Sequence, residues 1–148
     1  MKIRIKKLHP DARVPAYATQ GAACFDLHAC LKGAGTRTIY PGYPMTFGTG
    51  VAVEIPAGHV MLVFSRSGAG LVRDTRLANC VGVIDSDYRG EVFVRLSRDT
   101  APSEHLIVHE GDRIAQAMVL PVHQVEFDVA DELSPTERGE GGLGSTGA

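Results

Sequence analysis

Hydrophobic and polar residues alternate along much of this chain, with the period of two that is typical of half-buried β-strands. Residues 3–7 alternate apolar and charged side chains, and the run from 46 to 55 alternates clearly. Residues 60–64 form a short continuous apolar run, which indicates a buried strand. Turn residues separate such runs, so we expect roughly ten short strands and an all-β barrel or sandwich.

One polar stretch stands between two of these apolar runs. Val81–Ile84 precedes it and Val92–Val94 follows it, which predicts a β-hairpin. Its tip, Asp85–Gly90, groups two acids, a hydroxyl, an aromatic ring and a guanidinium. A turn that only reversed the chain would need fewer functional groups, so we expect this tip to carry chemistry.

The remaining pattern contains a single helix candidate and a tail. Residues 67–73 can form one helical stretch, with Ser67 as a plausible N-cap. Val125–Val129 alternates once more, and the apolar pattern stops after Asp131. We therefore expect one domain, with a β core at 1–131 and a flexible, glycine-rich C-terminal arm at 132–148.

Composition narrows the possible partners. The chain has 148 residues, 44% of them hydrophobic, and a formal net charge of -2, which is ordinary for a soluble globular domain. The absence of a basic stripe disfavours nucleic-acid binding, and no apolar run approaches the ~18 residues of a membrane span. Cys24, Cys30 and Cys80 lack metal-ligand spacing, which favours free thiols in a reducing cytoplasm.

Several segments place polar groups that suit phosphate beside glycine. Arg66–Gly68 offers a guanidinium, a hydroxyl and backbone N–H groups directly after a strand, and Gln116 offers an amide. Each segment also has an ordinary interpretation: Asp85 as a turn acid, Tyr88 as a surface tyrosine, the arm as a linker. Singly, these signals are weak.

Together they resemble the trimeric deoxyuridine triphosphate nucleotidohydrolases (dUTPases). That family has five ordered motifs, and the resemblance covers about residues 3 to 147. Here the motifs read Ala23–Leu27, Ser65–Gly68, Gly82–Gly90, Gly111–Gln116 and Arg138–Gly147. The third and fifth are the specific ones. The resemblance implies a distorted antiparallel β-barrel of jelly-roll-like (β-clip) type.

The resemblance also implies an activity: hydrolysis of dUTP to dUMP and pyrophosphate, which limits uracil incorporation into DNA and supplies dUMP. By resemblance Asp85 is the general base, acting on a water at the α-phosphorus, as a positioned carboxylate can. Tyr88 would lie under the deoxyribose and exclude a 2′-hydroxyl. Asn79 and backbone groups, including those of Val83 and Ile84, would read the uracil edge, although Asn79 could instead only brace the hairpin.

The phosphates and the metal would be held elsewhere. Asp26 resembles the acid that holds waters of a Mg²⁺ ion on the triphosphate. Ser67, Gly68 and Gln116 resemble phosphate contacts, whereas Arg66 either contacts phosphate or braces the site. Arg113 and Asp112 are interpreted as a structural pair at a turn.

The arm would close over the nucleotide in a homotrimer with shared active sites. By resemblance Arg138 meets the γ-phosphate, and Ser145 and Thr146 meet the β- and γ-phosphates. Leu143, followed by Gly144, stands where family members usually have an aromatic residue over the uracil. Leucine offers no ring face, so we expect a looser lid, by about 1 kcal/mol.

Other departures and alternatives stay open. The second motif lacks the proline before Arg66 and the leucine after Gly68 that are common in the family, which would alter packing more than chemistry. We assign no role to residues 98–104. A related dCTP deaminase or bifunctional enzyme is the second interpretation, and a non-catalytic nucleotide-sensing module is the third.

Overall fold

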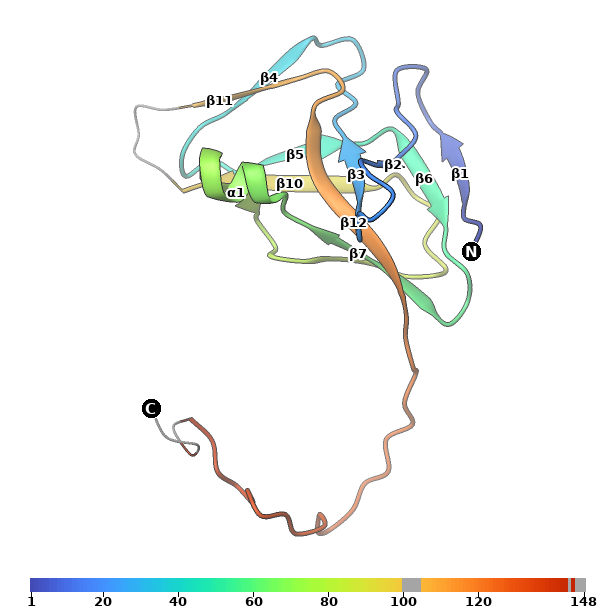
Figure 1. Ribbon diagram of the computed structural model, residues 1–148, viewed down its shortest axis with the longest axis vertical. Helices are drawn as coiled ribbons and strands as arrows, with labels where there is room; N and C mark the ends of the chain where they lie inside the picture. Colours follow the sequence, from blue (N-terminus) through green and yellow to red (C-terminus); the bar gives the residue numbers. More distant parts are fainter. Residues whose placement is uncertain (100–104, 144, 146–148) are drawn as a thin grey trace.

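The protein folds as a distorted, unclosed antiparallel β-barrel (Figure 1). The structure is a computed structural model that describes residues 1–99, 105–143 and 145. Within those residues there are twelve strands and one short helix. The predicted all-β class is therefore confirmed.

Four sheets make up the described body of the molecule, and all their strand pairs are antiparallel. The largest has the order β2-β3-β12-β7-β9. Its strands are β2 (Ala16–Tyr17), β3 (Phe25–His28), β12 (Arg113–Pro121), β7 (His59–Phe64) and β9 (Gly82–Ile84).

The smaller sheets pack around it. One has the order β5-β10-β8, and two pairs are β1-β6 and β11-β4. Their strands are β1 (Arg4–Lys7), β4 (Thr36–Ile39), β5 (Met45–Gly48), β6 (Val51–Glu54), β8 (Thr75–Leu77), β10 (Phe93–Arg98) and β11 (Leu106–His109). The alternating run at 46–55 forms two strands, because Gly50 turns the chain at a φ of 67°.

The core lies between these sheets. Phe47, Leu27, Ile39 and Met61 are almost completely buried there. Burying a side chain of this size contributes about 1.5–3 kcal/mol. In β7, inward Met61 and Val63 alternate with partly exposed neighbours, so only one face of this strand is fully buried.

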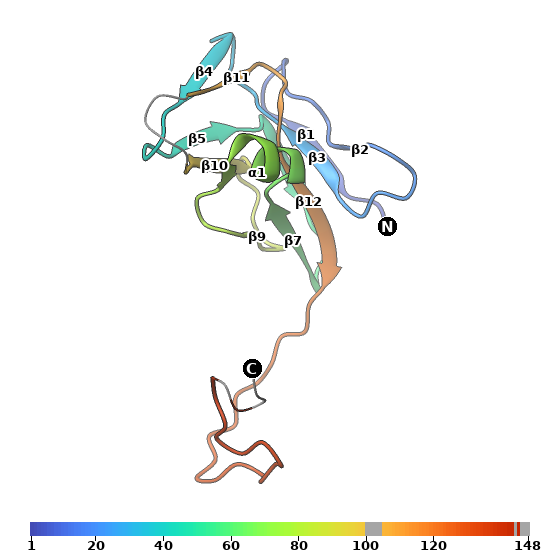
Figure 2. The same ribbon diagram turned by 60° about the vertical axis from the view of Figure 1, so that its left-hand side comes forward.

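The short helix α1 (Ser67–Arg73) lies near β10 and β12 (Figure 2). Its predicted position is confirmed, but the predicted N-cap is wrong. Arg66, not Ser67, is the N-cap and makes no side-chain cap hydrogen bond. The Arg66 carbonyl accepts the N–H groups of Ala69 and Gly70, so Ser67 already belongs to the first helical turn.

The predicted hairpin around Asp85 is not a paired hairpin. β9 pairs with β7, whereas β10 pairs with β5 and β8. The strands that flank the polar tip therefore belong to different sheets and splay apart. Alternation identified both strands but could not identify their partners, because the partners are distant in sequence.

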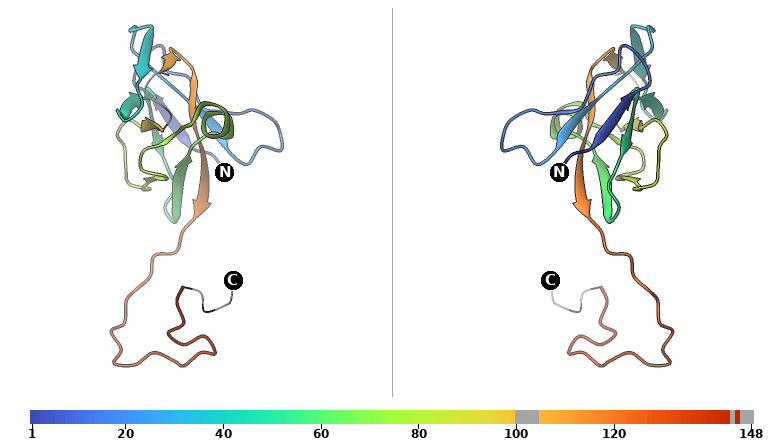
Figure 3. Two further views of the ribbon diagram at one scale, coloured as in Figure 1. Left: turned by 90° about the vertical axis from the view of Figure 1, so that its left-hand side faces the viewer. Right: turned by 90° about the vertical axis from the view of Figure 1, so that its right-hand side faces the viewer.

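After Pro121 the chain leaves the body as an extended arm (Figures 1 and 3). The alternating residues 125–129 form no strand here, and Phe127 and Val129 are 89% and 97% exposed. A strand needs a partner edge, and this segment has none within the described chain.

Candidate functional site

Three strands of the large sheet bring three of the sequence motifs into one row. Gln116 of β12 lies opposite Asp26 of β3 on one side and opposite Phe64 of β7 on the other. Cross-strand neighbours share a face of the sheet, and Ser65 and Arg66 follow Phe64 directly. The Gln116 amide Nε2 donates to the Ser65 carbonyl across 2.9 Å.

Asp26 is the anionic centre of this row. Its Oδ1 accepts from Arg66 Nε at 2.8 Å, and its Oδ2 accepts from Arg113 Nη1 at 3.3 Å. The expected pairing of Arg113 with Asp112 is therefore wrong. The Asp112 carboxylate instead accepts the backbone N–H of His109 at 2.9 Å, which closes the β11–β12 turn.

The surroundings of Asp26 are rich in arginine. His28 lies beside Arg113 across the strands. Burial and then the Arg13 guanidinium lower the pKa of His28 from its ordinary value, with Asp26 acting in the opposite direction. The Arg13 guanidinium lies against Gly111, which has a φ of 75° and leaves no room there for a Cβ. The row of Asp26 is thus a face suited to anions.

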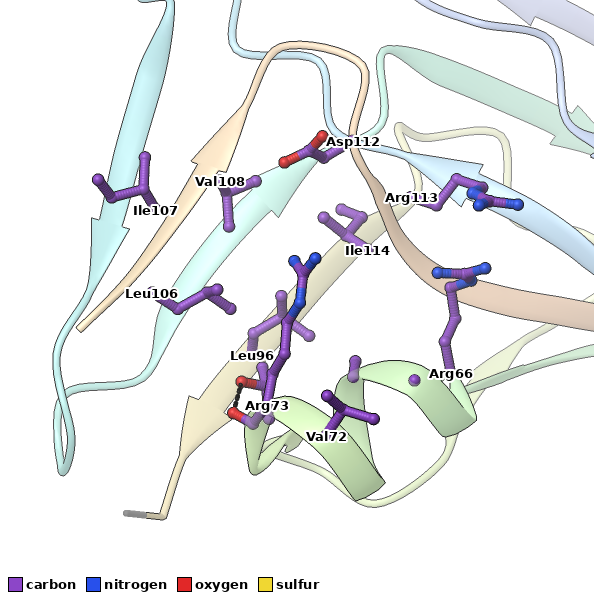
Figure 4. A pocket seen from close by; sticks show the side chains of 13 residues that line it. Arg66, Val72, Arg73, Leu96, Leu106, Ile107, Val108, Asp112, Arg113 and Ile114 are labelled. Atoms are coloured by element: carbon purple, nitrogen blue, oxygen red, sulfur yellow. Dashed lines mark hydrogen bonds between the residues drawn. The ribbon is translucent and has the colours of Figure 1, made fainter. Parts of the chain in front are cut away.

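A cleft of about 380 Å³ adjoins this row and lies between α1 and the strands β10, β11 and β12 (Figure 4). Arg66, Arg73 and Arg113 line its polar part, and Val72, Leu96 and Ile114 are among its apolar lining. Ala69 also borders the cleft. A leucine at position 69 would occupy part of this space, which gives the departure in the second motif a structural consequence.

The Asp85 tip is braced by its own arginine. Arg89 Nη1 donates to the carbonyls of Ser86 and Tyr88 at 2.6 and 2.9 Å. The Tyr88 hydroxyl donates to the Glu91 carbonyl at 2.9 Å, and the ring lies against Gly90. These contacts fix the turn that presents Asp85.

A hollow of about 170 Å³ lies where β9 and β10 splay apart; we call it the β9–β10 hollow. It is lined by Asn79, Gly82, Val83, Ile84, Phe93 and other residues. Asn79 Nδ2 donates to the Val81 carbonyl at 3.3 Å, so the amide braces its own turn in this structure. Gly82 approaches Val63 so closely that an added Cβ would lie 3.1 Å from it.

One chain does not bring all the predicted site residues together. Asp26, Arg66 and Gln116 share the polar row, with Ser67 and Gly68 next to it. Asp85 follows Ile84 of β9, three strand spacings from β3, or ~14 Å. Arg138 and Leu143 belong to the segment after β12, which extends away from the body (Figure 1).

Of the predicted site residues in the arm, the structure describes Arg138, Leu143 and Ser145. Arg138 Nε donates to the Gly141 carbonyl at 2.8 Å, and Ser145 N–H donates to the Gly142 carbonyl at 3.3 Å. Leu143 is fully exposed. Gly144 and Thr146 lie outside the described residues.

The described residues contain no group of three or more His, Cys, Asp or Glu side chains that could hold a metal ion. Asp26 is the carboxylate that the row itself contributes. Mg²⁺ is commonly bound through one or two carboxylates, several waters and substrate phosphates, and a lone acid fits that mode. Within the described part of the chain, no helix is long and apolar enough to cross a membrane.

Sequence reasoning missed two contributions. Arg113 was not recognised as the second partner of Asp26, because the two lie 87 residues apart and only the register joins them. Phe93 was not singled out, because the hollow that it lines exists only when β9 and β10 separate.

The fold and the arginine-rich row define an all-β protein with a face suited to anionic ligands. A family model described as dUTPase matches residues 10–147. Deoxyuridine 5′-triphosphate nucleotidohydrolases of Desulfitobacterium hafniense and Nautilia profundicola are 47% and 44% identical, the first over 99% of this chain and 97% of the relative, the second over 99% of both. The chain therefore belongs to the dUTPase family.

Solved structures agree with this assignment. Staphylococcus bacteriophage 80alpha dUTPase with dUPNHPP has a TM-score of 0.84 at 27% identity and covers 99% of both chains. The dUTPase of phage phi11 of S. aureus, described with a structural Mg(II) ion, has a TM-score of 0.80 at 22% identity. It covers 89% of this chain and 98% of that one, and shows the shared fold.

Proposed function

We propose that this protein hydrolyses dUTP to dUMP and pyrophosphate at a site shared between the subunits of a homotrimer. The observation that supports the proposal is the β9–β10 hollow, which is lined by Ile84 directly before Asp85, together with the arginine-rich row on another part of the same sheet. Family membership supplies the substrate class.

The β9–β10 hollow suits a flat base with hydrogen-bonding edges. Both backbone groups of Val92 point toward β5 and β6, because its carbonyl accepts from Thr49 and its N–H donates to Val51. Backbone directions alternate along a strand, so those of Phe93 point the other way, toward the hollow. The pairing of β10 with β8 begins only at Leu96, which leaves this edge open.

The facing strand is open too. β9 lies at the end of its sheet and has a strand neighbour, β7, on one side only within the described chain. Uracil would bridge the two open edges, with fixed backbone donors and acceptors selecting its pattern over that of cytosine. Val83, Ile84 and Asn79 would line the base, and the ring of Tyr88 would lie under the deoxyribose.

The reaction follows from Asp85. A water held by its carboxylate attacks the α-phosphorus, a P–O bond forms, and the bond to the bridging oxygen of the β-phosphate breaks. The proton of the water passes to Asp85, and pyrophosphate leaves. Arg66, Ser67, Gly68 and Gln116 would hold the phosphates.

Mg²⁺ bound to the triphosphate would supply charge neutralisation for the leaving pyrophosphate. Asp26 would meet the waters of this ion while its ion pairs keep Arg66 and Arg113 in place. Arg138, Ser145 and Thr146 of an arm would close over the phosphates, with Leu143 and Gly144 over the base.

A homotrimer is supported by the outer face of the large sheet. Residues on the same side of the sheet as Gln116 are apolar yet incompletely buried: Val60, Leu62, Phe64, Val83, Met118 and Leu120. Exposed apolar patches of this kind mark interfaces. Because this face is continuous with the Asp26 row, another subunit packed here could bring its own Asp85 tip to that row.

The direct test is pyrophosphate release from dUTP, UTP, dTTP and dCTP, each with Mg²⁺ and with a chelator. We expect Mg²⁺-dependent release from dUTP at least about 100-fold faster than from the others. Ammonia release from dCTP would overturn the hydrolase in favour of a deaminase. Binding of a dUTP analogue without any pyrophosphate release would favour a nucleotide sensor. A cytoplasmic location remains a prediction from the free thiols.

A further inference from the structure

The cleft between α1 and the strands β10, β11 and β12 is lined by a guanidinium that has no carboxylate partner among the described residues, that of Arg73. Figure 4 shows the Arg73 side chain projecting from the end of α1 across the cleft, toward Ile114 of β12. The backbone at Arg73 is fixed, because its carbonyl accepts the Thr75 hydroxyl and Arg98 Nη1, both at 2.8 Å. The charge of Arg73 is therefore directed into the cleft.

The cleft has room because α1 is not packed down through its own side chains. None of its residues is buried, and Val72 is 80% exposed. Ala69, which borders the cleft, stands where leucine is common in the family. Leu96 and Ile114 line the opposite wall. A space of about 380 Å³ with an apolar wall thus lies open beside Arg73, which is enough for a small organic molecule.

The polar mouth of the cleft is shared with the Asp26 row. Arg66 and Arg113 line the cleft and also donate to Asp26, at 2.8 and 3.3 Å. The carboxylate that lines the cleft, Asp112, accepts a backbone N–H at the β11–β12 turn. Three guanidinium groups thus stand against two carboxylates that already have partners, so the cleft favours a ligand with a negative charge.

The cleft is separate from the apolar face that supports the homotrimer. That face runs over β7, β9 and the end of β12 that contains Met118 and Leu120, whereas the cleft meets β12 at Arg113 and Ile114. The cleft lies between α1 and β11 instead (Figure 4). An oligomer assembled through the apolar face therefore leaves the cleft open to a ligand.

We propose that this cleft is a further binding site, for a small organic anion with an apolar body of the medium-chain carboxylate class. The carboxylate pairs with Arg73, and the aliphatic chain lies against Leu96 and Ile114. The bound anion also attracts Arg66 and Arg113 away from Asp26, and small displacements of positioning groups lower turnover. The binding site itself is independent of the proposed function, whereas this coupling rests on it.

Octanoate is the probe, and its displacement of the fluorescent anion anilinonaphthalene sulfonate from the assembled protein measures binding. Ala69→Leu fills part of the cleft and Arg73→Gln removes the charge, so each should weaken octanoate binding about tenfold. Arg4→Ala, on β1 away from α1 (Figure 1), is the control and should not change it. An octanoate affinity that is unchanged in the folded Ala69→Leu and Arg73→Gln variants overturns the site, as does the absence of saturable binding to the wild type.

Coupling is measured by pyrophosphate release at saturating dUTP. Octanoate should lower kcat of the wild type about tenfold and leave kcat of Ala69→Leu unchanged. An unchanged wild-type kcat at saturating octanoate overturns the coupling, and inhibition that excess dUTP abolishes places octanoate at the nucleotide site and overturns the proposal. A wild type that releases no pyrophosphate refutes the hydrolase, yet the fluorescence titrations still decide whether the cleft binds the anion. Thermal unfolding and sedimentation confirm that each variant is folded and assembled.

Discussion

Arg66 donates its Nε to Oδ1 of Asp26 across 2.8 Å, and so joins two motifs that lie 40 residues apart in sequence. Arg113 donates its Nη1 to the other carboxylate oxygen of Asp26, Oδ2, across 3.3 Å. The Asp26 side chain is only 11% exposed, whereas that of Arg113 is half exposed. A largely buried acid thus holds two guanidinium groups at the edge of the face that would meet phosphate.

Asp26→Asn should disturb the position of both arginines while keeping the size of the side chain. We expect kcat/KM for dUTP to fall about 10- to 100-fold, because small displacements of positioning groups are costly. Asp11→Asn, on an exposed loop, is the matched control. Steady-state pyrophosphate release measures the effect, and an Asp26→Asn variant with wild-type kcat/KM would refute the positioning role.

Asp85→Asn removes the proposed base without changing the shape of the tip. The expected result is a fall in kcat of about 10²- to 10⁴-fold, because the amide cannot accept the proton of the attacking water. Affinity for the non-hydrolysable dUpNHpp should be retained. Asp87→Asn, at the same tip, is the control and should lower kcat much less. A near-normal kcat in the Asp85→Asn variant would show that Asp85 is not the base.

Two glycines offer a paired test of the fold. Gly70 lies inside α1, where an added Cβ approaches only the Thr75 carbonyl, at 4.0 Å. Gly70→Ala should stabilise the protein by about 0.5–1 kcal/mol through helix propensity. Gly50→Ala should destabilise it, because Gly50 has a φ of 67° and its Cβ would lie 2.6 Å from that of Ala12. Thermal unfolding checks both, and a stabilising Gly50→Ala would contradict the assigned turn.

The three free thiols should react at different rates. Burial and then Asp26 raise the pKa of Cys24, and burial raises the pKa of Cys30, so less thiolate is present at mildly alkaline pH. Cys80 is exposed. A disulfide reagent at about pH 8 should label one thiol rapidly and the other two slowly until the chain is unfolded. Three equal fast phases would contradict the partly buried environment of Cys24 and the buried one of Cys30.

Much of the fold could be predicted from the sequence, because the positions of individual strands depend on local patterns of apolar and polar residues. Alternation located β1 and β6, a continuous apolar run located β7, a possible N-cap at Ser67 indicated the region of α1, and the polar stretch between two apolar runs located the Asp85 tip. The pairing of strands could not be predicted in the same way, since β9 pairs with β7 and β10 pairs with β5, which are distant in sequence. The separation of these two strands, which forms the hollow lined by Ile84, therefore becomes apparent only in the three-dimensional structure.

The candidate site was predictable as a set of residue types and not as an arrangement. The first motif predicts Asp26 as a functional acid. That Arg113 contacts Asp26 follows only from the register of β3 against β12. Likewise, residues 125–129 have the alternation of a strand, yet no partner edge for them lies within the described chain.

Subunit complementation tests the central claim most directly. Asp85→Asn and Arg66→Ala, each inactive alone, are mixed in equal amounts, dissociated and reassembled. If Asp85 and Arg66 of one active site come from different chains, random mixing leaves about one quarter of the sites intact, and dUTP hydrolysis should return to about a quarter of the wild-type rate. A mixture that stays as inactive as its components would contradict a shared site.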